Sequence, residues 1–442
     1  MKSLKNRMPM NPKSSDATPA PAKAPLAGAP VNDWLNYLEA IHPTEIDLGL
    51  DRVLVVLRRL FPTRPRSRII TVAGTNGKGS TVAALERLLQ ASGRTTGAYT
   101  SPHLDRYNER VRINGADIPD DSLVRAFEAV ESARGSVSLT YFEFGTLAAF
   151  VALAEAGVED WILEVGLGGR LDAVNVLDAD FAIITSIDID HVGFLGDNRE
   201  VIGYEKAGIL RPGIDAVCAD PQPPASVMQQ AGAQAVRLRL TGRDYQLTRQ
   251  GAGTMSLSLG DETIELPDGP LPLESLAAAV VACRHLAPAL SPSQITGVVE
   301  MLELAGRFET LRKQPLTLVD VGHNPHAARW LADRLARKRQ PGGRVYGIYG
   351  ALADKDVEGV VAAMAPVVDH WYLAGLAVPR GLSASGLGER VAGAGVDGFE
   401  TSTTVAEALE GALAAASPDD IIIAFGSFFT VSQARAASLT AC

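Results

Sequence analysis

One short segment constrains the fold of this chain more than any other, namely Gly74-Thr75-Asn76-Gly77-Lys78-Gly79-Ser80-Thr81. The apolar run Ile69–Ala73 precedes it, and leucines at helical spacing follow it. A strand, a glycine-rich turn and an amphipathic helix, in this order, predict a loop whose backbone N–H groups approach phosphate oxygens at the positive end of a helix. We expect Lys78 to reach the outer phosphates of a nucleotide, and a hydroxyl of Ser80 or Thr81 to bind Mg²⁺.

The segment departs from the common phosphate-loop pattern at two positions. That pattern has glycine where this chain has Val72, and Ser or Thr directly after the lysine, where this chain has Gly79. The alternative interpretation is a tight strand–helix turn with an exposed lysine. Because context and spacing agree from Ile69 to Leu89, the sequence favours the phosphate loop.

Short apolar runs alternate with helix-period segments from Trp34 onward. We expect buried strands at Arg68–Ala73, Asp160–Val165, Phe181–Ile187, Thr317–Val321, Val345–Tyr349 and Asp420–Phe425. We expect helices at Ser80–Ala91, Glu143–Ala156, Leu276–Leu286 and Asn324–Ala336. This alternation predicts an α/β protein built from βαβ units, with mainly parallel sheets covered on both faces. Tyr245–Thr248 and Met255–Leu259, among several glycines, predict a small antiparallel patch.

A domain boundary is expected after the helical stretch Ser293–Leu304, because a new strand–helix series begins near Leu316. Residues 31–304 then form the larger, nucleotide-binding domain, and residues 305–442 form a smaller, Rossmann-like α/β domain. The length fits two domains, since a domain commonly takes roughly 100–200 residues. Residues 1–30 are rich in Pro, Ala, Ser and Lys without periodicity, which predicts a disordered tail.

The composition excludes several classes of protein. The chain has 442 residues, with 41 Lys and Arg against 51 Asp and Glu, and a net charge of −10. An acidic chain of this kind is not expected to bind nucleic acid over a basic face. Its three cysteines, Cys218, Cys283 and Cys442, are far apart and predict neither a disulfide framework nor a zinc site. Without an apolar run long enough for a membrane span or a secretory signal, we expect a cytoplasmic protein.

Charged residues gather in the polar segment Thr100–Arg112. His103, Arg106 and Arg110 in this segment suit a carboxylate or a phosphate, and they equally suit a solvated surface loop. Glu143 opens a predicted helix, where a carboxylate either complements the helix dipole or binds Mg²⁺.

Further polar residues follow the ends of predicted parallel strands, where ligands collect in open α/β sheets. Glu164 lies near the carboxyl end of one such strand, Arg170 and Asp172 follow that strand, and His191 follows another. Lys206 lies in a predicted helix beginning near Arg199. In the second domain Asp320 and His323 end a strand, and Arg307 lies at the domain junction, where ligands often bind.

Taken together, these segments resemble the folylpolyglutamate synthase/dihydrofolate synthase family, the folate branch of the Mur ligase superfamily. The resemblance spans residues 31–442 and rests on GTNGKGS, TSPHL, RYNERV, YFEFGT, EVGLGGRLDAVN, TSIDIDH, EKAGI, GRFE, DVGHNPHAA, DKD and GSFFTV. It implies an enzyme that joins L-glutamate to a folate carboxylate with ATP and Mg²⁺, using two metal ions. The carboxylate takes the γ-phosphoryl group to give an acyl phosphate, which the amino group of glutamate then attacks.

The resemblance also implies roles for individual residues. Lys78, Lys206 and His323 match catalytic positions, and Lys206 matches a lysine that is often carbamylated. The ATP-binding positions are Gly74, Thr75, Asn76, Gly77, Lys78, Gly79, Ser80, Thr81, Arg307 and Asp320. The magnesium positions are Ser80, Ser101, Glu143 and His191. The substrate-binding positions are His103, Arg106, Arg110, Arg170 and Asp172, in and beyond the loop that receives the pterin in bifunctional members.

Two positions differ from the family pattern. Ser275 stands where relatives commonly have Asn before paired alanines, which weakens the transfer of an ATP contact there. Gly322 replaces the usual Ala, a small change that is expected to be harmless.

We expect a bifunctional, monomeric enzyme that adds glutamate to dihydropteroate and to the glutamate tails of tetrahydrofolate, with no nucleic-acid or membrane partner. The alternatives are a folylpolyglutamate synthase alone, another Mur-type amino-acid ligase, and a non-catalytic nucleotide-binding regulator. A peptidoglycan Mur ligase should carry a UDP-sugar-binding N-terminal domain, whereas only the short tail precedes the core here.

Overall fold

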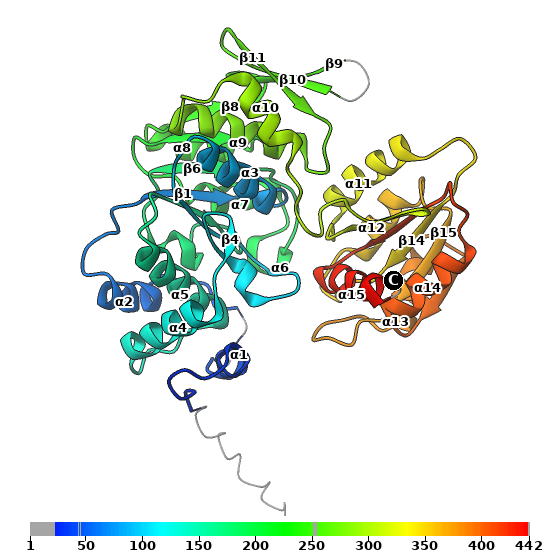
Figure 1. Ribbon diagram of the computed structural model, residues 1–442, viewed down its shortest axis with the longest axis horizontal. Helices are drawn as coiled ribbons and strands as arrows, with labels where there is room; N and C mark the ends of the chain where they lie inside the picture. The colour runs from blue at the N-terminus through cyan, green and yellow to red at the C-terminus, as the bar shows by residue number, and fades with distance from the viewer. Residues whose placement is uncertain (1–22, 43, 45, 251–253, 441–442) are drawn as a thin grey trace, which may run out of the picture.

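The run Arg68–Ala73 forms strand β1, which lies inside the large sheet of the first of two α/β domains (Figure 1). The computed structural model describes residues 23–440, apart from 43, 45 and 251–253. In this part of the chain the order of the large sheet is β4-β3-β2-β5-β1-β6-β7-β8. The other strands are β2 (Thr96–Tyr99), β3 (Val111–Ile113), β4 (Ala116–Asp117), β5 (Asp160–Glu164), β6 (Phe181–Ile184), β7 (Asp215–Cys218) and β8 (Arg237–Leu240).

Strands β2, β5, β1, β6, β7 and β8 run parallel, and among the described strands of this sheet only β3 runs in the opposite direction, since it pairs antiparallel with both β2 and β4. In register, Val72 of β1 pairs with Glu164 of β5 and with Ile183 of β6. The parallel pairing places the carboxyl ends of β5, β1 and β6 at one edge of the sheet, and it confirms the predicted fold class.

Helices cover both faces of this sheet because its central strands are buried on both sides. The face with helices α3, α9 and α10 buries one apolar cluster, and the opposite face buries a larger one. The first group is α3 (Lys78–Ala91), α9 (Leu273–Leu286) and α10 (Pro292–Glu300). The second group is α1 (Val31–Ala40), α2 (Asp51–Leu60), α4 (Asp120–Arg134), α5 (Tyr141–Ala156), α7 (Arg199–Ala207) and α8 (Ala225–Ala233), and the short helix α6 (Val192–Leu195) precedes α7.

The predicted antiparallel patch is a small sheet beside α9 and α10, with the described order β11-β10-β9. It comprises β9 (Gln246–Gln250), β10 (Thr254–Leu259) and β11 (Glu262–Pro267). The strand β11 was not predicted, because its exposed face carries Thr263 and Glu265, which interrupt any apolar run. Leu257 and Ile264 pair across β10 and β11 and are buried against the large domain.

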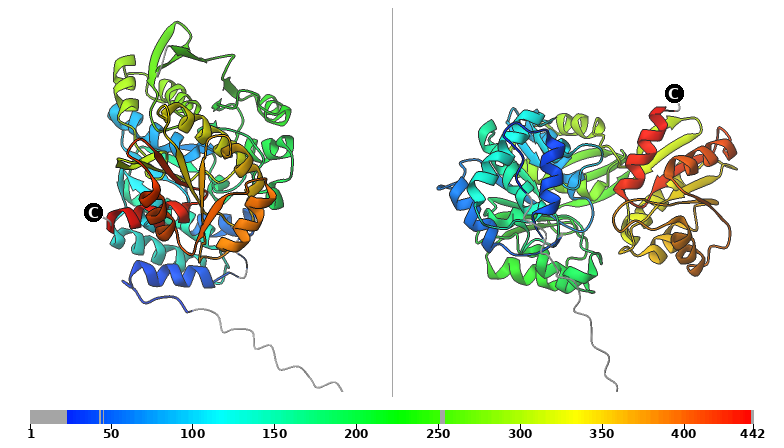
Figure 2. Two further views of the ribbon diagram at one scale, coloured as in Figure 1. Left: turned by 90° about the vertical axis from the view of Figure 1, so that its right-hand side faces the viewer. Right: turned by 90° about the horizontal axis from the view of Figure 1, so that it is seen from below.

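The second domain is built on a sheet with the described order β12-β13-β17-β14-β15-β16, parallel except for the β12–β13 hairpin. Its strands are β12 (Glu309–Lys313), β13 (Leu316–Asp320), β14 (Val345–Tyr349), β15 (His370–Ala374), β16 (Phe399–Ser402) and β17 (Ile421–Phe425). Its helices are α11 (Pro325–Lys338), α12 (Val357–Met364), α13 (Ala384–Gly393), α14 (Val405–Ala415) and α15 (Phe428–Thr440). Helices α11–α13 cover one face, and α14 and α15 cover the other (Figure 2).

The apolar clusters change from the first domain to the second between Leu304 and Phe308. Residues 1–22 of the predicted tail lie outside the described residues. Residues 23–30 contact the first domain. Ala24 and Ala29 pack against its core, and Gly28 N donates to Glu128 Oε1 at 2.7 Å. The predicted disordered tail therefore does not extend over residues 23–30.

One strand ends earlier than predicted, and the reason is the phosphate loop. The apolar run continues to Ile187, yet β6 ends at Ile184. Thr75 N donates to Ser186 O at 2.6 Å, and Thr185 Oγ1 donates to Asn76 O at 2.7 Å. Residues 185 and 186 thus leave the sheet to hold the loop from behind.

The two domains touch through a loop and a helix as well as through the site between them. Leu104 of the first domain packs against the core of the second, and Asp105 accepts hydrogen bonds from Ser432 Oγ at 3.0 Å and Arg435 Nε at 3.3 Å of α15. No helix within the described residues is long and apolar enough to cross a membrane.

Candidate functional site

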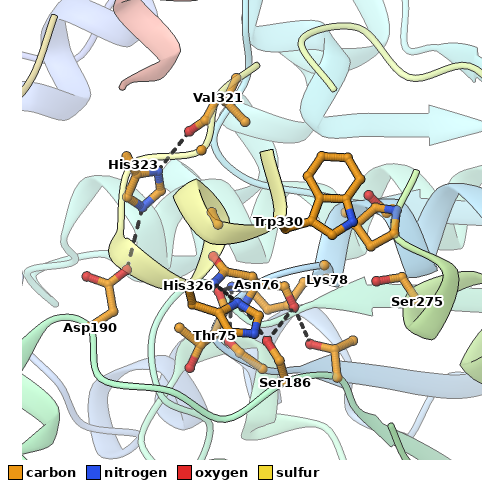
Figure 3. Close-up of a pocket in the computed structure, with 18 of the residues that line it drawn as sticks. Thr75, Asn76, Lys78, Ser186, Asp190, Ser275, Val321, His323, His326 and Trp330 are labelled. Atoms are coloured by element: carbon orange, nitrogen blue, oxygen red, sulfur yellow. Dashed lines mark hydrogen bonds and ion pairs between the residues drawn. The ribbon is translucent and has the colours of Figure 1, made fainter. Parts of the chain in front are cut away.

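A cavity of about 540 Å³ lies between the two domains, at the carboxyl ends of β1, β5, β6 and β13. The residues of the phosphate loop from Gly74 to Ser80 line one side of it. The second domain contributes Arg307, Asp320, His323, His326 and Trp330. Figure 3 shows Lys78 and Asn76 of the loop facing His326 and Trp330 of the second domain. This position is the one at which open α/β sheets bind ligands.

The phosphate loop needs its glycines for close packing as well as for backbone conformation. Gly77 has a φ of +83°, and a Cβ there would lie 2.2 Å from Ser275 Oγ. Lys78 Nζ donates to Gly74 O at 3.1 Å and to Thr75 O at 3.2 Å, so its ammonium group lies over the loop. Thr81 does not face the cavity, since it is buried and its hydroxyl points to Ser275 O at 3.4 Å.

Three residues with metal-binding side-chain atoms line the same cavity as the loop: Ser101, Glu164 and His191. Ser101 N donates to Glu164 Oε2 at 3.2 Å. Burial raises the pKa of Glu164, against the opposing charge of Lys78 and other groups. Burial lowers the pKa of His191 to about 4, although Asp190 opposes this, so its imidazole is neutral at pH 7.

The predicted metal ligand Glu143 lies elsewhere. Its carboxylate accepts Arg52 Nε at 2.8 Å on each oxygen and Thr140 N at 2.8 Å, within a capping box at the start of α5. The prediction of Glu143 at the metal site is wrong, because these partners occupy its carboxylate outside the cavity. Glu164, in contrast, lines the cavity and accepts Ser101 N. A Cβ on Gly79 of the phosphate loop would lie 3.7 Å from its Oε2.

The donor set suits Mg²⁺ rather than a metal held by protein side chains alone. Among the described residues there is no group of three or more His, Cys, Asp or Glu side chains that could hold a metal. Mg²⁺ commonly takes one or two carboxylates and fills its other positions with water and substrate phosphates. A buried carboxylate, a serine hydroxyl and a neutral imidazole beside a phosphate loop fit that requirement.

Lys206 lines the cavity from α7 and is only 3% exposed. No hydrogen bond or ion pair reaches its ammonium group from the described residues. Burial, and then the charge of Lys78, lower its pKa to about 7, while Asp190 and Asp172 oppose the shift. Lys206 is therefore partly uncharged at pH 7, in which state an amine is nucleophilic.

The predicted residues of the second domain face the same cavity. Asp320 accepts Phe308 N at 2.8 Å and Gly322 N at 2.7 Å, and burial raises its pKa against the charge of Arg307. Arg307 lies with its guanidinium carbon 5.0 Å from the Phe428 ring centre. Burial lowers the pKa of Arg307, although Asp320 and Glu164 oppose this.

The five predicted substrate-binding residues lie outside this cavity lining. Arg106 is exposed and pairs with Asp120, and Arg170 pairs with Glu205 on the surface. Asp172 is buried and accepts the backbone N–H groups of residues 167 and 174 at 2.9 and 3.0 Å.

The remaining two of these residues, Arg110 and His103, form a pair. Arg110 is 8% exposed, and its Nε lies 2.9 Å from His103 Nδ1. Its guanidinium carbon lies 5.0 Å from the Tyr107 ring centre and 5.6 Å from that of Tyr141. Burial, and then Arg110, lower the pKa of His103 to about 4, so the histidine is neutral at pH 7. Within the described residues no carboxylate pairs with Arg110.

Several residues of the site were not predicted as such. Asp190 accepts Lys355 Nζ at 2.9 Å, and His323 Nε2 lies 3.5 Å from its other oxygen. The hydrogen bond from His323 and the charges of His323 and Lys355 hold the pKa of Asp190 well below its usual value, although burial opposes them. Two sequence signals could have identified these residues. Asp190 directly precedes the candidate residue His191, and Lys355 lies in the DKD segment that the family resemblance includes.

In comparisons with known protein families, each of the two domains matches a different family model. Residues 72–244 match the family model described as Mur ligase middle domain. Residues 306–428 match the model described as Mur ligase, glutamate ligase domain.

Whole chains are also similar. The chain is 41% identical, over 413 residues, to the dihydrofolate synthase/folylpolyglutamate synthase of Escherichia coli (strain K12), covering 93% of this chain and 96% of that protein. The E. coli FolC structure in complex with DHPP and ADP matches with a TM-score of 0.88 at 41% identity, over 92% of this chain and 97% of that chain. The Yersinia pestis bifunctional folylpolyglutamate synthase/dihydrofolate synthase complexed with AMPPNP and Mn matches with a TM-score of 0.87 at 42% identity, over 94% and 99%.

The burial of Lys206 predicts that replacing it with an apolar side chain stabilises the fold. Its pKa falls from the ordinary 10.5 to about 7, so the unfolded chain binds more protons between these pH values and the stability of the wild type rises with pH. We expect Lys206→Met to raise the melting temperature near pH 7, at about 2–4 °C for each kcal/mol gained, and to lose this advantage toward pH 10.

Scanning calorimetry in bicarbonate-free buffer at the two pH values measures the effect. Lys313→Met, at an exposed lysine of β12, is the matched control and should show no gain. A melting temperature of Lys206→Met below that of the wild type near pH 7 would contradict the burial argument.

Proposed function

The chain belongs to the folylpolyglutamate synthase/dihydrofolate synthase family of Mur ligases, and from that premise we propose that it joins L-glutamate to dihydropteroate and to the glutamate tails of tetrahydrofolate. It is an ATP-dependent ligase that forms carbon–nitrogen bonds. The observation that carries the proposal is the cavity between the domains, where a phosphate loop, a buried carboxylate, a neutral imidazole and a partly uncharged lysine meet.

The reaction that we propose proceeds in two steps. An oxygen of the acceptor carboxylate attacks the γ-phosphorus of ATP, ADP leaves, and an acyl phosphate forms. The uncharged amino group of glutamate then attacks the acyl carbon, inorganic phosphate leaves, and the amine proton passes to solvent or to a nearby base. Positioning and charge neutralisation supply most of the rate enhancement in phosphoryl transfer.

The residues of the phosphate loop would hold the nucleotide through backbone N–H groups at the start of α3. Lys78, which now lies over Gly74 O and Thr75 O, would turn its ammonium group to the outer phosphates. From the second domain, Arg307 and His323 would offset negative charge on the transferred group, and Asp320 would keep their loop in place through Phe308 N and Gly322 N.

Mg²⁺ would be held by Ser101, Glu164 and His191, with Ser80 beside the phosphates, and the two ions of the proposal would share these donors with ATP. When bound, Mg²⁺ neutralises charge on the phosphates and orients them. The chain's own part is to keep the Glu164 side chain and a neutral His191 imidazole facing the loop. Burial keeps the imidazole neutral, whereas for Glu164 the charge of Lys78 opposes the rise in pKa that burial causes.

Lys206 would act as its carbamate. An uncharged amine adds CO₂ and releases one proton, and the product is an N-carboxylate. A pKa near 7 leaves part of the population ready for this at neutral pH. Electron density of crystals grown with bicarbonate above pH 7 would reveal the extra carboxylate, and density for a bare amine there would remove this part of the proposal.

The acceptor would bind beyond the metal site, at Arg110. A buried guanidinium with a neutral histidine and two aromatic rings around it lacks a counter-ion in the described chain and suits an oxygen of the acceptor. Arg106 and Arg170 are less suited, because Asp120 and Glu205 already pair with them.

The surroundings of the protein are proposed on simpler grounds. Cys218 and Cys283 are free and buried, which fits a reducing compartment, and we place the enzyme in the cytoplasm. One chain supplies both walls of the cavity, which supports a working monomer.

Replacing the lysine of the phosphate loop tests the nucleotide site. Lys78→Ala is expected to lower glutamate-dependent ADP release by roughly a hundredfold or more, because it removes the charge aimed at the transferred phosphoryl group. Lys313→Ala, on the exposed strand β12, is the control and should keep the wild-type rate. ADP release that survives Lys78→Ala unchanged would show that this loop does not carry the nucleotide.

Two isosteric substitutions separate Glu164 from Glu143 at the metal site. Glu164→Gln is expected to raise the Mg²⁺ concentration for half-maximal activity about tenfold or more, because it removes the buried carboxylate charge. Glu143→Gln should leave the Mg²⁺ requirement alone and lower the melting temperature, since it weakens the pair with Arg52. The opposite pattern in a Mg²⁺ titration would restore Glu143 as the ligand.

An ADP-release assay that compares dihydropteroate with tetrahydrofolate tests the two activities. With ATP, Mg²⁺ and L-glutamate, both acceptors are expected to support turnover. Arg110→Met should raise the KM of the acceptor roughly tenfold or more with little change in the KM of ATP, because a charged hydrogen-bonding group is lost. Product with tetrahydrofolate and no ADP with dihydropteroate would leave only the second activity. A larger effect of Arg106→Met would move the acceptor contact to the exposed arginine.

The same assay discriminates the non-catalytic alternative. A nucleotide-binding regulator would bind ATP and release no ADP in response to glutamate.

A further inference from the structure

One buried amide, that of Asn324, is hydrogen-bonded within its own domain and across to the other. Asn324 is 3% exposed and stands directly before α11. Its Oδ1 accepts Ala327 N and Asn76 Nδ2, each at 3.0 Å. Its Nδ2 donates to Asn76 Oδ1 at 2.9 Å and to Asp190 Oδ2 at 3.0 Å. An amide has two N–H donors and two acceptor lone pairs, so all four positions are used.

The partner Asn76 lies inside the phosphate loop. Its backbone is held from behind, because Asn76 N donates to Ser186 Oγ at 3.0 Å and Asn76 O accepts Thr185 Oγ1 at 2.7 Å. Its side chain therefore projects from a fixed backbone toward the second domain, where Nδ2 also lies 2.9 Å from His326 Nδ1. Figure 3 shows Asn76 and His326 facing each other beside Lys78.

The other partner, Asp190, belongs to the loop that carries His191. His191 N donates to Asp190 Oδ1 at 2.8 Å, and Lys355 of the second domain donates to the same oxygen at 2.9 Å. Asn324 thus contacts, with one side chain, both the loop for the phosphates and the loop that precedes a candidate metal ligand.

An ordinary helix cap explains only one of these four hydrogen bonds. The N-cap of α11 requires only the Oδ1 that accepts Ala327 N, and Asp serves as well as Asn at this position. The two bonds from Nδ2 are surplus to the cap, and both reach the first domain. A residue that only capped α11 would need no N–H donor in its side chain.

We infer that Asn324 is a positioning residue that sets the second domain in register on the phosphate loop and on the Asp190 loop. It brings Arg307 and His323 to the nucleotide in the arrangement seen here. The inference deepens the proposed function, on which its kinetic consequence rests. Without the two donated bonds, a smaller fraction of molecules holds the competent arrangement, and the apparent affinity for ATP falls by that fraction.

The substitution Asn324→Asp isolates the donor. The carboxylate keeps an oxygen for Ala327 N, so the cap of α11 is retained. It cannot donate to Asn76 Oδ1, and it places a second negative charge against Asp190. We expect the KM of ATP to rise about ten- to a hundredfold, as for the loss of hydrogen bonds to a charged group, and kcat to fall much less, since saturating ATP restores the arrangement.

A structural readout accompanies the kinetics. Small-angle X-ray scattering of the full-length protein without nucleotide should give a larger radius of gyration for Asn324→Asp than for the wild type. Asn198→Asp, which makes the same chemical change at the N-cap of α7 within the first domain, is the matched control. It should change neither the KM of ATP nor the scattering.

Asn76→Ala approaches the contact from the other domain and leaves the cap of α11 untouched. It is expected to reproduce the larger radius of gyration, and it decides the question if Asn324→Asp fails to fold. Scattering curves of Asn324→Asp and Asn76→Ala that superpose on the wild type would overturn the inference. An expanded Asn324→Asp in a protein without glutamate-dependent ADP release would support the positioning role while contradicting the proposed function.

Discussion

The backbone polar groups of the phosphate loop can form hydrogen bonds within the protein only on the side that faces away from the cavity. The arrangement of the rest of the site follows from this constraint. Its N–H groups that face the cavity must stay available for phosphate, while its remaining polar groups need partners within the protein. The segment after β6 supplies them, through Thr75 N to Ser186 O at 2.6 Å and Thr75 Oγ1 to Asp188 O at 2.9 Å. Because this segment continues into Asp190 and His191, the support of the loop also fixes the neighbouring metal-binding side chain.

Burial acts in opposite directions on the ionisable groups of this site. It raises the pKa of Glu164 and lowers those of His191 and Lys206. All three shifts favour neutral groups, and bound phosphates and cations would bring compensating charge to each of them. The net charge of −10 belongs to the chain as a whole. The described cavity lining carries four lysine and arginine side chains against four carboxylates, so anionic ligands depend on where the cations lie and not on an excess of them.

Local patterns were predictable from the sequence, and long-range contacts were not. The strand before the phosphate loop and β14 have the predicted bounds, and α3 begins two residues before its predicted start. The end of β6 was missed because an apolar run does not reveal that Thr185 and Ser186 turn to bind the loop. Glu143 and Glu164 both lie at an end of a predicted element, and the contact that holds Glu143 away from the cavity comes from Arg52, 91 residues earlier in the chain. Asn324 gave no signal, since its partners Asn76 and Asp190 lie 248 and 134 residues away in the chain.

Water can replace most of the contacts that join the two domains. Asn76 with Asn324, Asp190 with Lys355, Asp188 with Arg329 and Asp105 with Arg435 are all polar pairs. When these polar pairs separate, water can solvate each group. Leu104 is the apolar side chain named here that separation would expose. Separation of the two domains at these pairs would therefore expose little of the apolar surface that drives proteins to aggregate.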